Sequence, residues 1–155
     1  MRVVAQRVAS GAVSWEEGGE RQRASIGHGY VLLVGAAAND DEASVRRLAD
    51  KIIDLRAFAD ESGKMNLSLV DVHGAALIVS QFTLFADMSR GRRPSLLKAG
   101  DPARAEQLYD TFARHFRDRG IETETGSFGA VMRVSIDNDG PVTLVLSTDD
   151  WVTHV

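Results

Sequence analysis

Two amphipathic helical segments set among short apolar runs are the feature that most limits how this chain can fold. The first segment, 41–55, follows the capping sequence Asn39-Asp40-Asp41-Glu42, and its apolar residues recur three and four positions apart: Val45, Leu48, Ala49, Ile52 and Ile53. The second is capped by Asp101, has Pro102 in its first turn and ends at Gly120, with an apolar stripe of Ala105, Leu108, Tyr109, Phe112 and Phe116. We therefore predict two helices, each of which buries one face against another layer.

The rest of the chain has the pattern of a sheet. Apolar runs of strand length occur at 3–8, 24–26, 30–34, 75–79, 131–136 and 142–146. The last two flank Asp137-Asn138-Asp139-Gly140, which has the composition of a hairpin turn. No repeat and no long linker divides the sequence. We expect a single α+β domain over residues 1–155, with a mainly antiparallel, barrel-like sheet that is covered by two helices.

The composition excludes several classes of protein. The 155 residues include no cysteine, which rules out disulfides, thiolate catalysis and metal sites built on sulfur. No apolar run approaches the ~20 residues of a membrane span. Arg2 and Arg7 interrupt the first apolar segment, so it cannot supply the uninterrupted apolar stretch of a signal peptide. These features predict a cytoplasmic protein. Its net charge of −4 means that any contact with nucleic acid must be local.

The usual signatures of metal and nucleotide chemistry are missing. The histidines are not spaced as metal ligands, and Asp137-Asn138-Asp139-Gly140 lacks the later ligands of a calcium loop. Neither a phosphate-binding loop nor a G-x-S-x-G elbow occurs, and Gly27-His28-Gly29 lacks the third glycine of a dinucleotide fingerprint. We expect neither a metal nor a cofactor.

Three less usual segments remain. They are Ser80-Gln81-Phe82-Thr83-Leu84, which follows the apolar run 75–79, Gly126-Ser127-Phe128-Gly129-Ala130, and Gly140-Pro141 before Val142-Thr143. Each has an ordinary explanation on its own: a polar strand end, a tight glycine loop, and a hairpin that places proline at the start of a strand. Loops at strand ends also commonly carry binding groups. Composition alone leaves both explanations open.

Together these segments resemble the D-aminoacyl-tRNA deacylase family, the D-tyrosyl-tRNA deacylases. The resemblance covers essentially the whole chain, and two motifs carry its specificity: Ser80-Gln81-Phe82-Thr83 and Asn138-Asp139-Gly140-Pro141-Val142-Thr143. The supporting segments are Arg2-Val3-Val4-Ala5-Gln6-Arg7-Val8, Gly63-Lys64-Met65-Asn66-Leu67-Ser68, Arg90-Gly91-Arg92-Arg93-Pro94 and Gly126-Ser127-Phe128-Gly129-Ala130. Ser10-Gly11 and Glu16-Glu17-Gly18-Gly19 depart from the family's pattern, in the region of the first hairpin.

The resemblance implies a homodimeric hydrolase that cleaves the ester between a D-amino acid and the 3′-terminal adenosine of tRNA, as a step of translational proofreading. It also implies removal of glycine mischarged on alanine tRNA. The Gly140-Pro141 peptide is expected to be cis and to reach into the active site of the partner subunit. The site residues that the resemblance carries over are catalytic Ser80, Gln81, Phe82 and Thr83, and substrate-binding Gly140, Pro141, Phe128, Gly129, Ala130 and Met132.

Neither signature motif contains a side chain that titrates near neutral pH, so neither supplies a general base. An aminoacyl ester is already activated, and the neighbouring ribose 2′-hydroxyl can assist a water, which leaves the protein to orient and stabilise the reactants. We expect the backbone N–H groups of Phe82 and Thr83 to hold the developing oxyanion. The alternative makes the Thr83 hydroxyl the nucleophile, although no histidine or lysine adjoins it in sequence.

Rejection of L-amino acids requires bulk on one side of the α-carbon. We expect the carbonyl edge of Gly140-Pro141 to form this wall, and Phe128 and Met132 to shape the floor of the pocket. Glycine would pass, because it carries hydrogen on both sides. Since rejection by overlap is repulsive, it can exceed the roughly 1 to 3 kcal/mol that an apolar pocket gains from one methylene.

The densest basic segment of the chain is the expected phosphate contact for tRNA, and it contains Arg90, Arg92, Arg93 and Lys98. The alternative is an ordinary solvated loop. For the protein as a whole, the rival to an enzyme is a catalytically silent RNA-binding or protein-interaction module that keeps the same fold.

Overall fold

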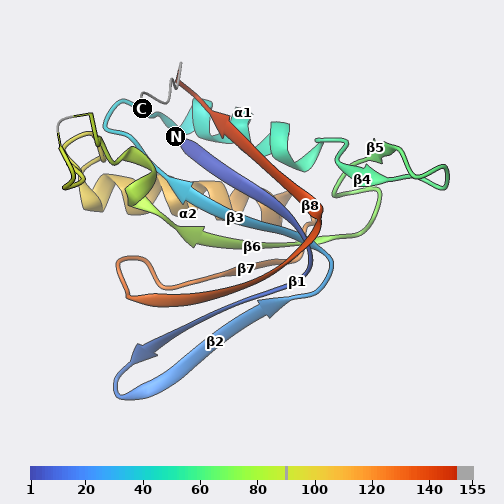
Figure 1. Ribbon diagram of the computed structural model, residues 1–155, viewed down its shortest axis with the longest axis horizontal. Helices are drawn as coiled ribbons and strands as arrows, with labels where there is room; N and C mark the ends of the chain where they lie inside the picture. Colours follow the sequence, from blue (N-terminus) through green and yellow to red (C-terminus); the bar gives the residue numbers. More distant parts are fainter. Residues whose placement is uncertain (90, 150–155) are drawn as a thin grey trace.

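The computed structural model describes residues 1–89 and 91–149 (Figure 1). Its elements in chain order are β1 (Arg2–Glu17), β2 (Glu20–Ile26), β3 (Gly29–Gly35), α1 (Glu42–Ile53), β4 (Phe58–Ala59), β5 (Met65–Leu67), β6 (Ala75–Ser80), the 3-10 helix η1 (Phe82–Phe85), α2 (Pro102–Asp118), β7 (Thr123–Thr125) and β8 (Met132–Ser147). Both predicted helices are present, and their observed ends differ from the predicted ends by one or two residues.

Strand β1 is the spine of a six-stranded mixed sheet. Along residues 2–8 it lies between β3 and β8, and along residues 11–15 it lies between β2 and β8, always with antiparallel pairing. Strands β3, β6 and β7 extend the sheet with parallel pairing. The sheet curls strongly, so that β2 returns toward β6 and β7 (Figure 1). The expected α+β domain with a mainly antiparallel, barrel-like sheet and two helices is confirmed.

The predicted hairpin at 137–140 is wrong. The runs 131–136 and 142–146 are not two antiparallel strands, because β8 follows β1 from Met132 to Ser147 as one strand. The partner of β8 shifts from Val8, opposite Asn138, to Gln6, opposite Thr143, so the residues between them bulge out of the ladder. Asp, Asn and Gly favour bulges as well as turns. Because the long strand β1 pairs with both halves of β8, the segment 137–140 forms a bulge within one strand and not a turn between two strands.

Strand β1 itself is longer than predicted, because it continues past Val8 through Ser10-Gly11. Gly11 allows the chain to pass close to β3, since a Cβ atom at this position would lie only 2.5 Å from Val31 Cγ2. The short elements β4, β5, β7 and η1 have two to four residues each, too few for the apolar patterns to predict.

Both helices pack on the same face of the sheet and against each other (Figure 1). The core between these layers contains the inward residues of β1, β3 and β6 and the predicted helical stripes. All five stripe residues of α1 are buried, as are Leu108, Tyr109, Phe112 and Phe116 of α2. Each helix begins at an aspartate whose carboxylate accepts a backbone N–H: Asp41 from Ser44 at 2.7 Å, and Asp101 from Arg104 at 3.1 Å.

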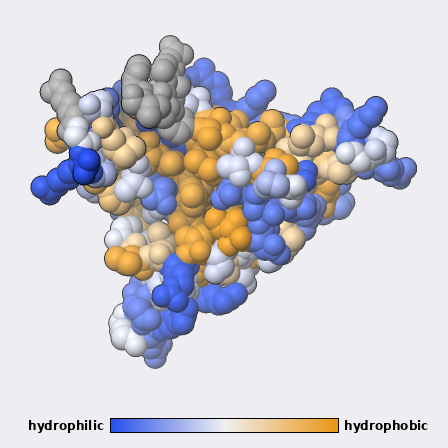
Figure 2. Space-filling model, viewed as in Figure 1, coloured by the Kyte–Doolittle hydropathy of each residue, from blue (hydrophilic) through white to orange (hydrophobic). Residues whose placement is uncertain are grey.

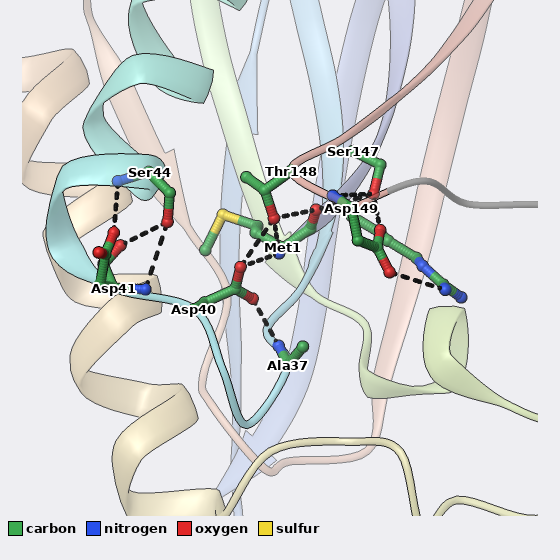
Figure 3. A network of polar contacts seen from close by, with 9 residues as sticks. Met1, Ala37, Asp40, Asp41, Ser44, Ser147, Thr148 and Asp149 are labelled. Atoms are coloured by element: carbon green, nitrogen blue, oxygen red, sulfur yellow. Dashed lines mark hydrogen bonds and ion pairs between the residues drawn. The ribbon is translucent and has the colours of Figure 1, made fainter.

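A buried polar network joins the starts and ends of several elements (Figure 3). The α-amino group of Met1 donates to Asp40 and to Thr148, and the backbone N–H of Ala37 donates to the other oxygen of Asp40 at 2.7 Å. Burial lowers the pKa of this α-amino group, while the Asp40 carboxylate acts in the opposite direction. The network fixes the connection between β3 and α1, which begins beside the candidate site described below.

Two buried tyrosines give a stability prediction. Among the described residues, none lies within hydrogen-bond distance of the Tyr30 hydroxyl, whereas the Tyr109 hydroxyl donates to the Ile78 carbonyl at 2.7 Å. We expect Tyr30→Phe to keep or raise the free energy of unfolding by up to about 1 kcal/mol, because it removes an unsatisfied group, and Tyr109→Phe to lose about 1 kcal/mol. Urea unfolding at pH 7 measures both; a loss of more than 1 kcal/mol for Tyr30→Phe would contradict this account of the hydroxyl.

The same substitution has a pH dependence. Burial raises the pKa of Tyr30 to about 12, so between pH 10 and 12 the phenol stays neutral in the folded protein and ionises in the unfolded chain. The ionisation of Tyr30 therefore has no effect on stability below about pH 10, and it lowers the free energy of unfolding as the pH rises through about 12. We expect the unfolding free energy of the wild type to fall more steeply over this range than that of Tyr30→Phe.

Candidate functional site

The carboxyl ends of β3 and β6 open into a cavity of about 480 Å³. The two strands are parallel and in register, so that Val34 lies opposite Ser80 and the strands end together. The remaining walls come from the loop 96–100, the first half of α2 and the segment 126–130, and most of the lining side chains are apolar. Ligands of sheets with parallel strands commonly bind beyond the carboxyl ends of the strands. The geometry therefore makes this cavity the candidate site.

Six of the residues predicted for the site line this one cavity: Ser80, Gln81, Phe82, Phe128, Gly129 and Ala130. They come from the Ser80-Gln81-Phe82-Thr83 motif and from the segment 126–130, which lie far apart in sequence. The first motif leaves the end of β6, and the second follows β7, which pairs with β6 and ends beside it at Thr125. The parallel pairing of β6 with β7 thus brings the two motifs together.

The backbone of the first motif is held at its start and open at its centre. The N–H of Gln81 donates to the Val34 carbonyl at 2.7 Å, and the Gln81 carbonyl accepts from the N–H of Leu84 at 3.2 Å. The N–H groups of Phe82 and Thr83 lie between these two, in the first turn of η1, where a helix leaves its N–H groups without a partner inside the turn. This arrangement can present two backbone donors to an anionic oxygen.

Thr83 does not line the cavity wall, and its side chain is exposed. Its hydroxyl accepts a hydrogen bond from the side-chain amide of Gln81. Within residues 1–89 and 91–149, no histidine, lysine or carboxylate is hydrogen-bonded to this hydroxyl. Nothing in the described surroundings would activate it as a nucleophile.

The Gly140–Pro141 peptide bond is cis, as expected, and both residues are exposed on the bulge of β8. They do not line the cavity of their own chain. Two side chains fix the bulge. The Asn138 amide donates to the carbonyls of Arg7 and Val142 at 2.9 and 3.0 Å, and Arg7 Nε donates to the Asp139 carbonyl at 3.1 Å. These hydrogen bonds therefore fix the conformation of the bulge at the surface.

Arg7 is the residue at this bulge whose role sequence reasoning missed. Its guanidinium also forms an ion pair with the Asp139 carboxylate at 3.2 Å and donates to the Ala57 carbonyl at 2.6 Å, and its side chain is only 12% exposed. In the sequence, Arg7 counted only as a charge that interrupts an apolar strand. A charged residue inside an apolar strand pattern indicates that Arg7 has a partner, but the sequence does not show which one.

Met132 lies outside the cavity lining, although it was expected to shape the floor. It starts β8 opposite Trp15, and its sulfur packs against Gly126, where a Cβ atom would approach it to 2.4 Å. Met132 therefore supports the beginning of the segment 126–130.

Three of the four predicted tRNA-binding residues belong to the loop that leads to the cavity residues Leu96 and Ala99. Arg90 falls outside the described residues, while Arg92 and Arg93 are exposed in the loop that continues to Leu96, a cavity residue. Lys98 Nζ forms an ion pair with Asp87 at 2.9 Å, and this contact together with hydrogen bonds from Ser89 holds the pKa of Asp87 well below its usual range. A phosphate would have to compete with Asp87 for Lys98. Within the described part of the chain, Arg92 and Arg93 form no ion pair with which a phosphate would compete.

Among the described residues, no group of three or more histidine, cysteine, aspartate or glutamate side chains is placed to hold a metal ion. In the same part of the chain, no helix is both long enough and apolar enough to cross a membrane.

Comparison with known proteins gives a consistent result. Residues 4–147 match the family model described as D-Tyr-tRNA(Tyr) deacylase. The chain is 49% identical to a D-aminoacyl-tRNA deacylase of Bacillus pumilus, over 97% of this chain and 100% of that protein, and 51% identical to one of Thermomicrobium roseum, over 96% and 94%. Among solved structures it resembles a c-Myc DNA Unwinding Element Binding Protein, with a TM-score of 0.86 and 38% identity over 96% of this chain and 99% of that chain.

The bulge of β8 gives a prediction at Gly140. This residue has φ +128°, and a Cβ atom would lie 2.8 Å from Val142 Cγ2 and 2.9 Å from Arg7 Nη2. Gly63 is a matched control, because it also has a positive φ of 77° but has nothing within 4 Å of a Cβ atom. We expect Gly63→Ala to lose about 1 kcal/mol of unfolding free energy from backbone strain alone, and Gly140→Ala to lose about 2 to 3 kcal/mol. Equal losses in urea unfolding would contradict the close packing at Gly140.

Proposed function

Because the chain belongs to the D-Tyr-tRNA(Tyr) deacylase family, we propose that it hydrolyses the ester bond that joins a D-amino acid to the 3′-terminal adenosine of tRNA. The observation that carries the proposal is the cavity in which residues 80–82 of the Ser-Gln-Phe-Thr motif meet residues 128–130, at the carboxyl ends of β3 and β6. Its volume of about 480 Å³ is in the range of small-molecule sites, roughly 300 to 1,000 Å³. The enzyme is thus a carboxylic ester hydrolase that edits aminoacyl-tRNA.

The reaction needs a water, an activated ester and a place for negative charge. In the proposed mechanism the water oxygen attacks the carbonyl carbon, and the bond to the ribose 3′-oxygen breaks. The 2′-hydroxyl of the same ribose relays a proton from the water to the departing 3′-oxygen, so no protein side chain needs to act as the base. The N–H groups of Phe82 and Thr83 stabilise the oxyanion that forms in between.

This mechanism predicts the effect of Thr83→Ala. The substitution keeps the backbone N–H group, so we expect kcat for D-tyrosyl-tRNA to stay within about threefold of the wild type. If the Thr83 hydroxyl were the nucleophile, kcat would fall by several thousandfold. Single-turnover hydrolysis of labelled D-tyrosyl-tRNA measures the difference, and Ser95→Ala, in the nearby loop but outside the cavity wall, is the control.

We further propose that the site is completed by a second copy of the chain. Gly140 and Pro141 are exposed and lie away from their own cavity, which suits a wall delivered to a partner. Figure 2 shows apolar side chains gathered in the middle of the face where Figure 1 places β8 and β1. The exposed apolar residues of β8 and η1 include Ile136, Val145 and Phe82. An apolar face of this kind is typical of an interface between subunits.

In the dimer, the carbonyl edge of Gly140–Pro141 occupies the space that an L side chain would need, and Arg7 and Asn138 hold that edge in place. A D side chain points away from this wall. Glycine has no side chain to exclude, and we propose that the enzyme also removes it from mischarged alanine tRNA. Because the substrate is tRNA in use for translation, we place the enzyme in the cytoplasm.

A defined heterodimer tests the wall. One chain carries Gly140→Ala, which displaces the wall, and the other carries Ala130→Phe, which fills its own cavity but keeps a native wall. The only open cavity in this heterodimer then faces a native wall from the partner. We expect the Gly140→Ala homodimer to hydrolyse L-tyrosyl-tRNA and the heterodimer to regain preference for the D form. A heterodimer that accepts the L form as readily as the Gly140→Ala homodimer would show that the wall acts within one chain.

The rival function is a nucleic-acid-binding module without catalytic activity. The name of one similar structure, c-Myc DNA Unwinding Element Binding Protein, is the reason to test it. Incubation with D-tyrosyl-tRNA and L-tyrosyl-tRNA separates the two. The proposed enzyme releases D-tyrosine and spares the L ester. Binding of tRNA or DNA without release of either amino acid would favour the rival.

For tRNA binding, we propose that Arg92 and Arg93 contact phosphates near the cavity rim, with Arg90 as a further candidate. Their exposure and their freedom from ion pairs within the described residues support this role. Lys98 is the weaker candidate, because its charge is already balanced by Asp87.

A further inference from the structure

The carbonyl oxygen of Ile78 lies at a fork between two walls of the cavity. Ile78 belongs to β6, two residues before Ser80, and pairs with Thr125 at the end of β7. Its carbonyl accepts the backbone N–H of Gly126 at 3.2 Å, the last hydrogen bond between β6 and the chain that leads into the segment 126–130. Beyond this point one chain becomes the Ser80–Thr83 segment and the other becomes the Phe128 wall.

Tyr109 of α2 reaches this fork from a third direction. Its hydroxyl donates to the same Ile78 carbonyl at 2.7 Å, and the residue is 5% exposed. Its ring lies 5.8 Å from the ring of Phe128, measured between centroids, with a tilt of 52°. Tyr109 also lines the cavity itself. One side chain therefore touches the fork, the Phe128 wall and the cavity.

We infer that Tyr109 is a positioning residue, which sets the distance between the Phe128 wall and the Ser80–Thr83 segment. The inference rests on the proposed function, because it concerns the placement of the aminoacyl ester between these two walls. Tyr109 acts through its neighbours and not on the ester. Its proton is engaged by the Ile78 carbonyl, and burial raises its pKa far above neutrality, so it does not exchange a proton with the substrate.

The two walls depend on Tyr109 to different degrees. The Ser80–Thr83 segment is tied to β3 by the hydrogen bond from Gln81 N to Val34 O and continues a fully paired strand. The segment 126–130 is tied to β6 at Gly126 and then forms only a local turn, in which the N–H of Ala130 donates to the Ser127 carbonyl at 3.3 Å. Loss of the Tyr109 hydroxyl should therefore loosen the Phe128 wall and leave the reacting segment in place.

The test is the split between KM and kcat in Tyr109→Phe, which keeps the ring and removes only the hydroxyl. We expect KM for D-tyrosyl-tRNA to rise about fivefold, the equivalent of one buried hydrogen bond, and kcat to change less than about twofold. An unchanged KM would overturn the inference, and so would a fall in kcat alone, because that would place the effect on the reacting segment.

Two controls separate positioning from general stability. Phe112→Leu removes a fully buried ring from the same helix, away from the cavity, and should lower the melting temperature without changing KM. Tyr30→Phe removes a hydroxyl that has no partner among the described residues, so it should leave KM unchanged and should not lower the melting temperature. A Phe112→Leu enzyme with the same rise in KM would reduce Tyr109 to a stability role and overturn the inference. Wild-type hydrolysis in the same assay reports on the proposed function independently.

Discussion

The parallel pairing of β3 with β6 is the constraint on which the rest of the site depends. It aligns Val34 with Ser80, so both strands end at one edge and leave a space beyond it. The pairing of β6 with β7 then brings the segment 126–130 to the same edge. A cavity forms because β3 and β6 end together, β7 ends two residues earlier beside Ile78, and the first half of α2 closes the remaining side. Without this register, the segments 80–83 and 126–130 would not meet at one edge of the sheet.

The site that results is mostly apolar and poor in titrating groups, which fits a reaction whose ester is already activated. In the proposed mechanism, the protein contributes backbone donors from η1, a shaped wall and a fixed distance between them. Each contribution is held by hydrogen bonds to backbone carbonyls: Gln81 to Val34, Tyr109 to Ile78 and Arg7 to Asp139. Bonds of this kind fix geometry without a protein side chain that takes or gives a proton at the ester, so in the proposed mechanism water is the nucleophile and the tRNA relays the proton.

The sequence predicted the elements that are set by local residue spacing, above all the two helices. The stripes of α1 and α2 follow from helical periodicity, and every predicted residue of the α1 stripe is buried. Residues from 80–82 and 128–130 were placed in the site by resemblance to a family, since their chemistry alone is ordinary. The bulge of β8 was mistaken for a hairpin because Asp, Asn and Gly suit both, and only the length of β1 distinguishes them. Arg7 and Tyr109 could not be predicted, because their roles exist only through contacts with distant backbone carbonyls.

The central claim is that the protein orients the ester while the tRNA's own ribose supplies the proton relay. The most direct measurement is single-turnover hydrolysis of D-tyrosyl-tRNA whose terminal adenosine lacks the 2′-hydroxyl and carries the ester on its 3′-oxygen. The account predicts a rate at least about 100-fold below that of the normal substrate, with binding retained, which is the size of effect expected from losing a proton relay. A rate within a few-fold of normal would show that the protein itself activates the water.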